Sequence, residues 1–273
     1  MEKKGTIISI TMVIIIVACA AAYIIFSGII AHEYNYVQIE VNPRVEFLCD
    51  KKFDVVSVFP LNDDARIVLS DLDLIGLDVD EATTVFLGEC AKTGYLDVNG
   101  VNNSTNITVI DGITQALDVH VTQKVYTYYR ENEIMSAVIE TYEDRGIFDE
   151  KKKNKVDCSN KYKLITTILE TNQDKDIEEL RKNSEVELVE MVADRHKENP
   201  YTPRQEEIQT KQNLISKNQT KYNKHMKAIT NNSQKEFSEL FEDFQKNSIK
   251  SYQENFNKEY TIWQENRVYW QYR

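Results

Sequence analysis

The chain has 273 residues, 28% of them charged and 41% hydrophobic, and its formal net charge is −11. The acidic excess lies in residues 33–195, with 18 Lys and Arg against 33 Asp and Glu, whereas residues 196–273 hold 13 against 10. An acidic domain with a mildly basic tail argues against nucleic acid as a partner.

The first element in chain order is an apolar segment without a charged residue, from Thr6 to Ala31. As a helix, these 26 residues would extend about 39 Å and cross a bilayer core of about 30 Å with some tilt. Lys3 and Lys4 precede the segment, so the positive-inside rule places residues 1–5 in the cytoplasm and everything after Glu33 outside. The sequence therefore predicts a single-pass protein of a bacterial cell membrane.

Two other interpretations of this segment stay open. A cleaved signal peptide would normally have an apolar region of only about 7–15 residues. The run Ile16-Val-Ala-Cys19 resembles a lipoprotein processing box, although eleven mostly apolar residues follow Cys19. An intact membrane anchor accounts for the full length of the segment better than either alternative.

The next stretch, from Tyr36 to Leu48, alternates apolar and polar side chains as a half-buried strand does. Pro43 interrupts it, although proline has no N–H for a ladder and is normally kept to edges or bulges. An Asn42-Pro43 bond in a strand just after a membrane segment is the most informative feature of the sequence.

The rest of the chain up to residue 199 mixes strands and helices, which indicates an α+β fold. Further strands are predicted over 53–59, 66–74, 107–110 and 135–141. Helices are predicted over 78–92, 113–130, 162–169 and 177–192. The expected domains are 33–148, a juxtamembrane α+β domain that begins with a β-hairpin, and 149–199, a pair of closing helices.

Residues 200–273 are expected to form an amphipathic helical or partly disordered tail, loosely tied to the domain. Ile208, Ile215, Tyr222 and Ile229 recur every seven residues, but the companion positions are mostly polar, which argues against a tight coiled coil. The tail is interpreted either as an arm that contacts a partner or the cell wall, or as a spacer of low specificity.

Several of these segments together resemble a known family. The run Tyr36-Val-Gln-Ile-Glu-Val-Asn-Pro-Arg-Val-Glu-Phe47 is similar to the strand motif of RsgI-like anti-sigma factors, and Val55-Val-Ser-Val-Phe-Pro-Leu-Asn62 is similar to the second strand of that family's hairpin. Weaker similarity continues through Asp71-Leu-Asp-Leu-Ile-Gly76, Lys92-Thr-Gly-Tyr95 and the closing helices, over roughly residues 34–195.

The resemblance implies self-cleavage at Asn42-Pro43, with the two pieces still joined by strand pairing. The residues can perform this chemistry: the Asn42 side-chain nitrogen can attack its own carbonyl, close a succinimide and expel the Pro43 nitrogen. Attack by water is the other route. Both routes need backbone strain. A plain β-bulge proline is the alternative, and Arg44 stands where the family usually has a small serine.

The resemblance further implies signalling through sigma factors, with an intramembrane protease acting on the membrane stub. The family's cytoplasmic sigma-binding domain is not seen before the apolar segment, so we expect the signal to pass through a separate anti-sigma or sigma protein. The competing hypothesis is an uncleaved structural or adhesion protein of the cell envelope whose tail binds the wall or a partner.

We expect no cofactor, no metal and no enzyme activity beyond a single-turnover cleavage. The four histidines are in no metal-ligand spacing, and the sequence has neither a nucleophile elbow nor a phosphate-binding glycine loop. Cys49, Cys90 and Cys158 match no metal motif and are interpreted as buried free thiols. Asp71 to Gly76 imitates a calcium loop but lacks its ligand pattern, so a strand edge and a helix cap explain it better.

Overall fold

The fold is known from a computed structural model, which describes residues 34–111, 116–140, 160–172, 174–229 and 234–266. The predicted membrane segment, the stub before it, the basic stretch around 151–155, Cys19 and Cys158 lie outside these residues. Within the described part of the chain, no helix combines the length and the apolar character needed to cross a bilayer.

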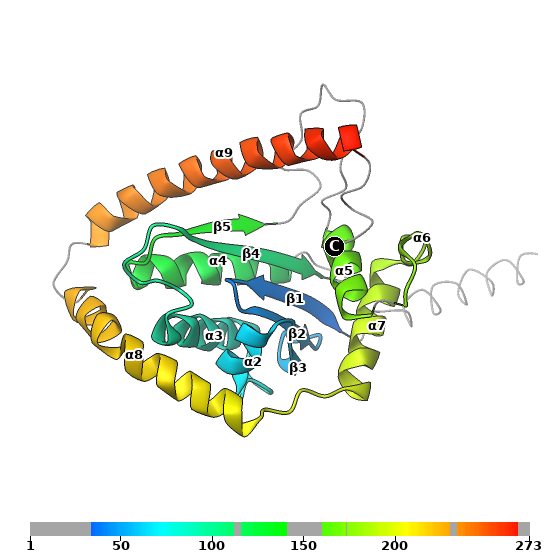
Figure 1. Ribbon diagram of the computed structural model, residues 1–273, viewed down its shortest axis with the longest axis horizontal. Helices are drawn as coiled ribbons and strands as arrows, with labels where there is room; N and C mark the ends of the chain where they lie inside the picture. Colours follow the sequence, from blue (N-terminus) through cyan, green and yellow to red (C-terminus); the bar gives the residue numbers. More distant parts are fainter. Residues whose placement is uncertain (1–33, 112–115, 141–159, 173, 230–233, 267–273) are drawn as a thin grey trace, which may run out of the picture. The chain divides into compact units, whose positions relative to one another are not determined.

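A five-stranded sheet forms the centre of the domain, in the order β3-β2-β1-β4-β5 (Figure 1). Its strands are β1 (Asn35–Glu40), β2 (Arg44–Cys49), β3 (Val55–Pro60), β4 (Asn103–Ile110) and β5 (Ser136–Glu140). The pairs β3-β2, β2-β1 and β1-β4 are antiparallel, and β5 runs parallel to β4. Strand β1 is therefore the central strand, hydrogen-bonded to a neighbour on each side.

The described helices pack on both faces of the sheet or continue the chain beyond it. They are α2 (Asp63–Leu69), α3 (Val79–Thr93), α4 (Ala116–Glu131), α5 (Asn160–Thr171), α6 (Ile177–Leu180), α7 (Glu185–Glu198), α8 (Gln205–Ile229) and α9 (Gln234–Asn266). The α+β class predicted from the sequence is thus confirmed for the described residues.

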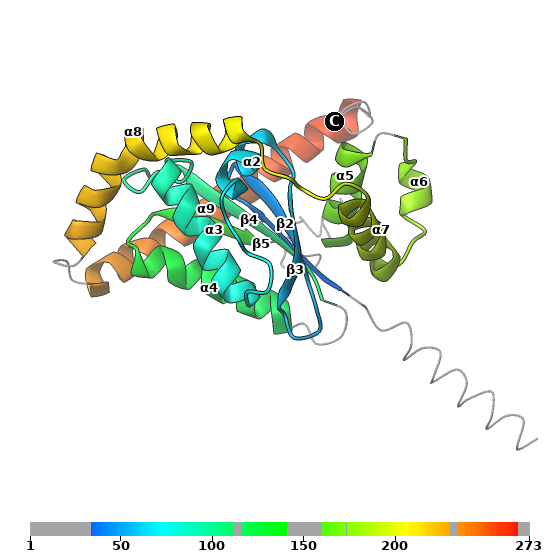
Figure 2. The same ribbon diagram turned by 90° about the horizontal axis from the view of Figure 1, so that it is seen from below.

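Helices α3 and α4 lie on one side of the sheet and α5 and α7 on the other (Figure 2). The period-2 pattern of β1 and β2 divides their side chains between these two layers. Val37, Ile39 and Phe47 are fully buried on the face covered by α3 and α4. Tyr36 and Leu48 are buried on the opposite face, with α5 and α7. Both faces of β1 are thus covered, so polar side chains of the strand such as Gln38 are buried as well.

Local signals explain where α3 begins and ends and where α7 begins. Asp78 caps α3 by accepting a hydrogen bond from the backbone of Asp80, and Gly94 ends it with φ +88°, a conformation that glycine adopts without strain. The predicted helix over 177–192 is instead two helices, because Ser184 begins α7 with a capping box completed by Glu187.

The strand predicted over Arg66 to Leu74 is wrong. Asn62 accepts a hydrogen bond from Ala65 N and caps the short helix α2, whose first turn is acidic. Ala65, Val68 and Leu69 are its buried residues. This helical spacing includes too few apolar residues to be told from strand alternation in the sequence.

The tail is helical, as expected, but its loose attachment is contradicted. Helix α8 packs against α2 and α3, and α9 packs against α4 and β5. Phe241 of α9 is fully buried in the core of the domain, and Lys211 of α8 is fully buried as well. The Gln245 side chain bonds both backbone groups of Val138 in β5, at 2.9 and 2.5 Å. The described tail is therefore part of the domain.

Candidate functional site: the Asn42-Pro43 turn

The Asn42-Pro43 bond lies in the tight connection between β1 and β2, not inside one strand. Glu40 pairs with Arg44, so residues 41–43 form the turn of an antiparallel hairpin, closed by a bond from Val41 N to Pro43 O of 3.0 Å. The sequence interpretation of a single strand with a proline bulge is wrong. A proline in this turn needs no ladder partner, which is why it is accommodated here.

Asn42 itself is held in an uncommon backbone conformation. Its φ is +116°, outside the region that side-chain-bearing residues adopt without strain, and such a residue costs about 1–3 kcal/mol. The flanking Val41 and Pro43 are buried, while Asn42 is exposed. The two strands therefore fix a turn that its own sequence would not favour.

The polar groups of Asn42 are bonded to residues at the start of α2. Its Nδ2 donates to Asp64 Oδ2 at 3.1 Å, and its carbonyl oxygen accepts from Asn62 Nδ2 at 2.6 Å. Asn62 Oδ1 accepts from Arg44 N at 3.1 Å and from Ala65 N at 2.9 Å. One side chain thus caps α2, closes the hairpin and bonds the carbonyl of the Asn42-Pro43 peptide.

A tyrosine from the end of α3 completes the site. Tyr95 donates its hydroxyl to Asp64 Oδ1 at 2.8 Å. Burial, and then the hydrogen bond to Asp64, raise the pKa of Tyr95, so the hydroxyl stays protonated and remains a donor. Asp64 is therefore bonded through both oxygens, one to Tyr95 and one to the Asn42 amide.

Sequence reasoning found Asn42 and Pro43 but missed Asn62, Asp64 and Tyr95. A usable signal was present, because Asn followed by two acidic residues is typical of a helix N-terminus. It was interpreted as a turn between two strands. Recognising it as a cap would have placed Asn62 at the start of a helix, but not beside Asn42.

A second polar cluster lies on the other face of the sheet. Glu46 of β2 is fully buried and pairs with Arg195 of α7, while His196 Nε2 lies 3.2 Å from its carboxylate. Tyr36 donates to Glu46 at 2.8 Å, and burial, followed by the nearby Glu46 charge, raises the pKa of Tyr36. This buried network attaches α7 to the hairpin.

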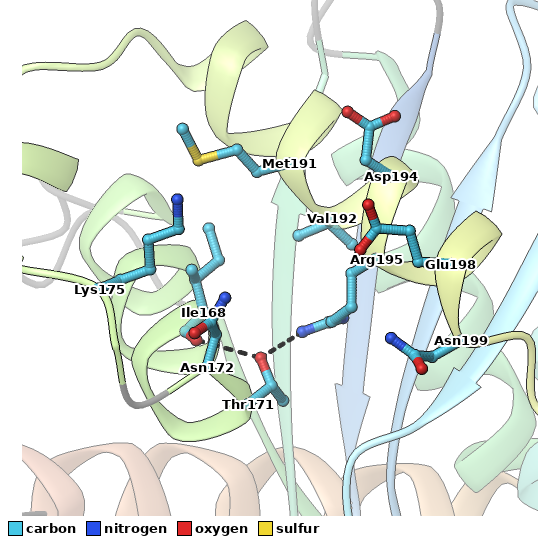
Figure 3. Close-up of a pocket in the computed structure, with 10 residues that line it drawn as sticks. All are labelled: Ile168, Thr171, Asn172, Lys175, Met191, Val192, Asp194, Arg195, Glu198 and Asn199. Carbon is cyan, nitrogen blue, oxygen red and sulfur yellow. Dashed lines mark hydrogen bonds between the residues drawn. The ribbon is translucent and has the colours of Figure 1, made fainter.

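A cavity of about 300 Å³ adjoins this cluster between α5 and α7 (Figure 3). Arg195 reaches into it and donates to Thr171 Oγ1 at 2.5 Å. The lining carries Lys175 as well as Asp194 and Glu198, and the Arg195 charge is already paired with Glu46. Charges of both signs therefore line the cavity and favour no class of ligand, so the Asn42-Pro43 turn is the stronger candidate site.

The described residues hold no group of three or more His, Cys, Asp or Glu arranged to bind a metal. Cys49 and Cys90 are buried free thiols, as predicted, and burial is the main cause that raises the pKa of both. Of the acidic residues in the apparent calcium loop, Asp71 instead pairs with Lys211, and Asp78 caps α3.

The fold and site together define a class: a small α+β domain whose central strand ends in a strained asparagine-proline turn. Residues 34–167 match the family described as "Anti-sigma factor RsgI-like central domain". Three curated proteins of Acetivibrio thermocellus are similar to this chain: anti-sigma-I factor RsgI5 (23% identity over 147 residues, 52% of this chain and 29% of the relative), RsgI9 (38% over 64 residues, 23% and 9%) and RsgI3 (30% over 69 residues, 25% and 11%).

Residues 34–167 therefore form a domain of the RsgI-like anti-sigma factor family. The chain spans less than a third of the length of these curated relatives. The family match ends at residue 167, so helices α6 to α9 lie beyond it.

Proposed function

We propose that this protein is a membrane-anchored regulator of sigma-factor signalling whose RsgI-like domain cleaves itself at Asn42-Pro43. The observation that carries the proposal is the turn itself. Asn42 has a positive φ, its amide is bonded to a carboxylate, and the carbonyl that would be attacked is bonded to a side-chain amide. An ordinary hairpin turn requires none of these contacts.

The position of β1 supports retention of the two pieces after a cut. Residues 35–40 pair with β2 on one side, and residues 36–40 pair with β4 on the other. Both neighbours belong to the piece that begins at Pro43. Each ladder hydrogen bond contributes about 1 kcal/mol net, so a cut strand would stay in the sheet until it is pulled out.

We infer the rest of the pathway from the family and the sequence. Residues 6–31 would anchor the chain with its N-terminus in the cytoplasm. Force on the domain would extract β1, and an intramembrane protease would then cut the remaining stub. The signal would reach a separate anti-sigma or sigma protein. Such a protein performs one cleavage on itself and is not a turnover enzyme.

A gel of freshly prepared membranes tests the proposal. We expect two bands, corresponding to residues 1–42 and 43–273, and only the full-length band in Asn42→Ala. Full-length chain alone in the wild type would contradict self-cleavage and favour the uncleaved envelope protein. Protease added to intact cells should digest the domain, whereas complete protection would overturn the proposed orientation.

A further inference from the structure

We propose that Asp64 and Asn62 are catalytic residues for cleavage at Asn42-Pro43, and that Tyr95 positions Asp64. This inference rests on the proposed function. Asn62 caps α2 and Asp64 lies in its first turn, so the reaction is assigned to a helix that was not predicted from the sequence.

Asp64 is placed to accept the proton that the attacking nitrogen must lose. A primary amide is a poor nucleophile until a base takes a proton from it. Asp64 Oδ2 lies 3.1 Å from Asn42 Nδ2, and the other oxygen is occupied by the Tyr95 hydroxyl at 2.8 Å. Tyr95 therefore holds the carboxylate so that its other oxygen faces Asn42. The neighbouring Asp63 is exposed and has no such contact among the described residues.

Asn62 is placed to stabilise the oxyanion that forms on the Asn42 carbonyl. Its Oδ1 accepts from two backbone N–H groups, Arg44 N and Ala65 N, and this fixes which end of the amide is oxygen. The Nδ2 donor must then face the Asn42 carbonyl oxygen, at 2.6 Å. A preorganised donor at that distance lowers the energy of the developing negative charge.

The step balances without any co-reactant other than water. Asn42 Nδ2 forms a bond to the Asn42 carbonyl carbon, and the bond from that carbon to the Pro43 nitrogen breaks. The proton lost by Nδ2 passes to Asp64 and finally resides on the Pro43 nitrogen, which becomes the new N-terminal secondary amine. The first piece ends in a succinimide, which water then opens. Release of the turn also relieves the strained φ of Asn42.

The test follows cleavage of full-length chain made by cell-free translation into lipid nanodiscs, with time points taken by gel. Asn62→Asp keeps the oxygen that caps α2 and closes the hairpin, but it replaces the donor with a carboxylate oxygen. We expect its rate to fall at least about a hundred-fold, the size of a lost oxyanion donor. Asn42→Ala gives the uncleaved reference.

Asp64→Ala should also slow cleavage about a hundred-fold, as expected for a lost general base. Added formate should restore part of the rate, while neutral acetamide should not. Asp63→Ala is the matched control and should cleave at the wild-type rate. Tyr95→Phe should slow cleavage about five-fold, the size of one hydrogen bond, and should add nothing in the Asp64→Ala background. Mass spectrometry should find the first piece one water lighter before hydrolysis.

The outcomes separate the two proposals. A wild-type chain that never cleaves overturns the proposed function. A wild-type chain that cleaves, while Asn62→Asp and Asp64→Ala cleave equally fast, overturns the roles assigned here and leaves self-cleavage standing. Asn62→Asp counts only if it keeps the wild-type protease-resistance pattern, which shows that it is folded. If it does not, Asp64→Ala is the deciding variant, and slow cleavage that formate fails to restore rejects Asp64 as the base.

Discussion

Strand β1 and helix α8 both complete the domain, but they are held by different interactions. Val37 and Ile39 of β1 are buried in the apolar core with side chains of α3 and α4. The buried residues of α8 are Glu207 and Lys211, which are charged. Apolar burial is non-directional, whereas a buried charge is stable only while its particular partners are present.

Several polar contacts of α8 reach α2, the helix that begins with Asp63 next to the Asn42 turn, and others reach α3. Arg66 Nε of α2 donates to Glu207 of α8 at 2.6 Å. The Arg66 carbonyl oxygen accepts from the hydroxyl of Tyr201, which lies just before α8, at 2.8 Å. Lys211 donates to Val68 O at 2.8 Å. Helix α8 therefore holds the same helix, α2, whose first turn contacts the candidate cleavage site.

Ile39→Asp should destabilise the apolar packing of β1 and have the largest effect of the variants proposed here. This change places an unpaired charge in the core, and we expect it to lower the free energy of unfolding by about 4 kcal/mol or more. Urea titration of the membrane-bound chain checks this value. If the chain is cut, the piece 43–273 should also leave the membranes. Val56→Asp, at an exposed position of β3, is the control and should change little.

Lys211→Met tests the polar attachment of α8. The change leaves Glu89 and Asp71 without their buried cation and Val68 O without its donor. We expect a loss of roughly 2–3 kcal/mol, below the usual cost for a fully buried pair because the half-exposed Asp71 can rehydrate. Amide hydrogen exchange should rise in α2 and α8. Lys217→Met, exposed on the same helix, should leave exchange unchanged.

Acid should loosen α8 before it affects β1. Burial raises the pKa of Glu207, but hydrogen bonds from Arg204 and Arg66 outweigh this effect and hold the pKa below its usual 4.5. A carboxyl group whose pKa is lower in the folded than in the unfolded protein stabilises the fold at pH values above its unfolded pKa. This contribution is lost as the pH falls through the folded pKa. Exchange near the start of α8 should therefore increase below about pH 4.5.

Glu207→Gln is the variant that isolates this effect. It should show faster exchange already at neutral pH and no further acid step at this position. Glu206→Gln, whose carboxylate is exposed, should keep the wild-type profile. An unchanged acid step in Glu207→Gln would show that another carboxylate releases the helix.

The smallest effect is expected at the surface pair between Lys221 of α8 and Asp97. Their atoms lie 2.5 Å apart, and a hydrogen bond from Lys221 is the main cause that lowers the pKa of Asp97. Both side chains are nearly half exposed, so we expect a coupling of less than about 1 kcal/mol that weakens further in salt. A double-mutant cycle of Lys221→Ala and Asp97→Ala measures it; a larger coupling would make this pair part of the buried attachment.

The elements with strong local signals were predictable. The alternation in β1, the cap at Asp78 with the stop at Gly94, and the buried thiols Cys49 and Cys90 all agree with the sequence interpretation. The strand predicted over 66–74 failed because α2 has too few apolar residues for its period to be read. For α8 the prediction of a loose tail failed because a helix attached by charged side chains has the composition of a solvated helix.

By itself, the sequence determined the α+β class, the family motif and the Asn42-Pro43 bond, because these depend on residue order within a few positions. Only the tertiary structure decided that this bond is a hairpin turn, that Asn62 and Asp64 hold it, and that Tyr95 orients Asp64. Asn62 lies 20 positions from Asn42, and Tyr95 lies 31 from Asp64. Hydrogen bonds over such separations are set by how strands and helices pack, and no local pattern records that packing.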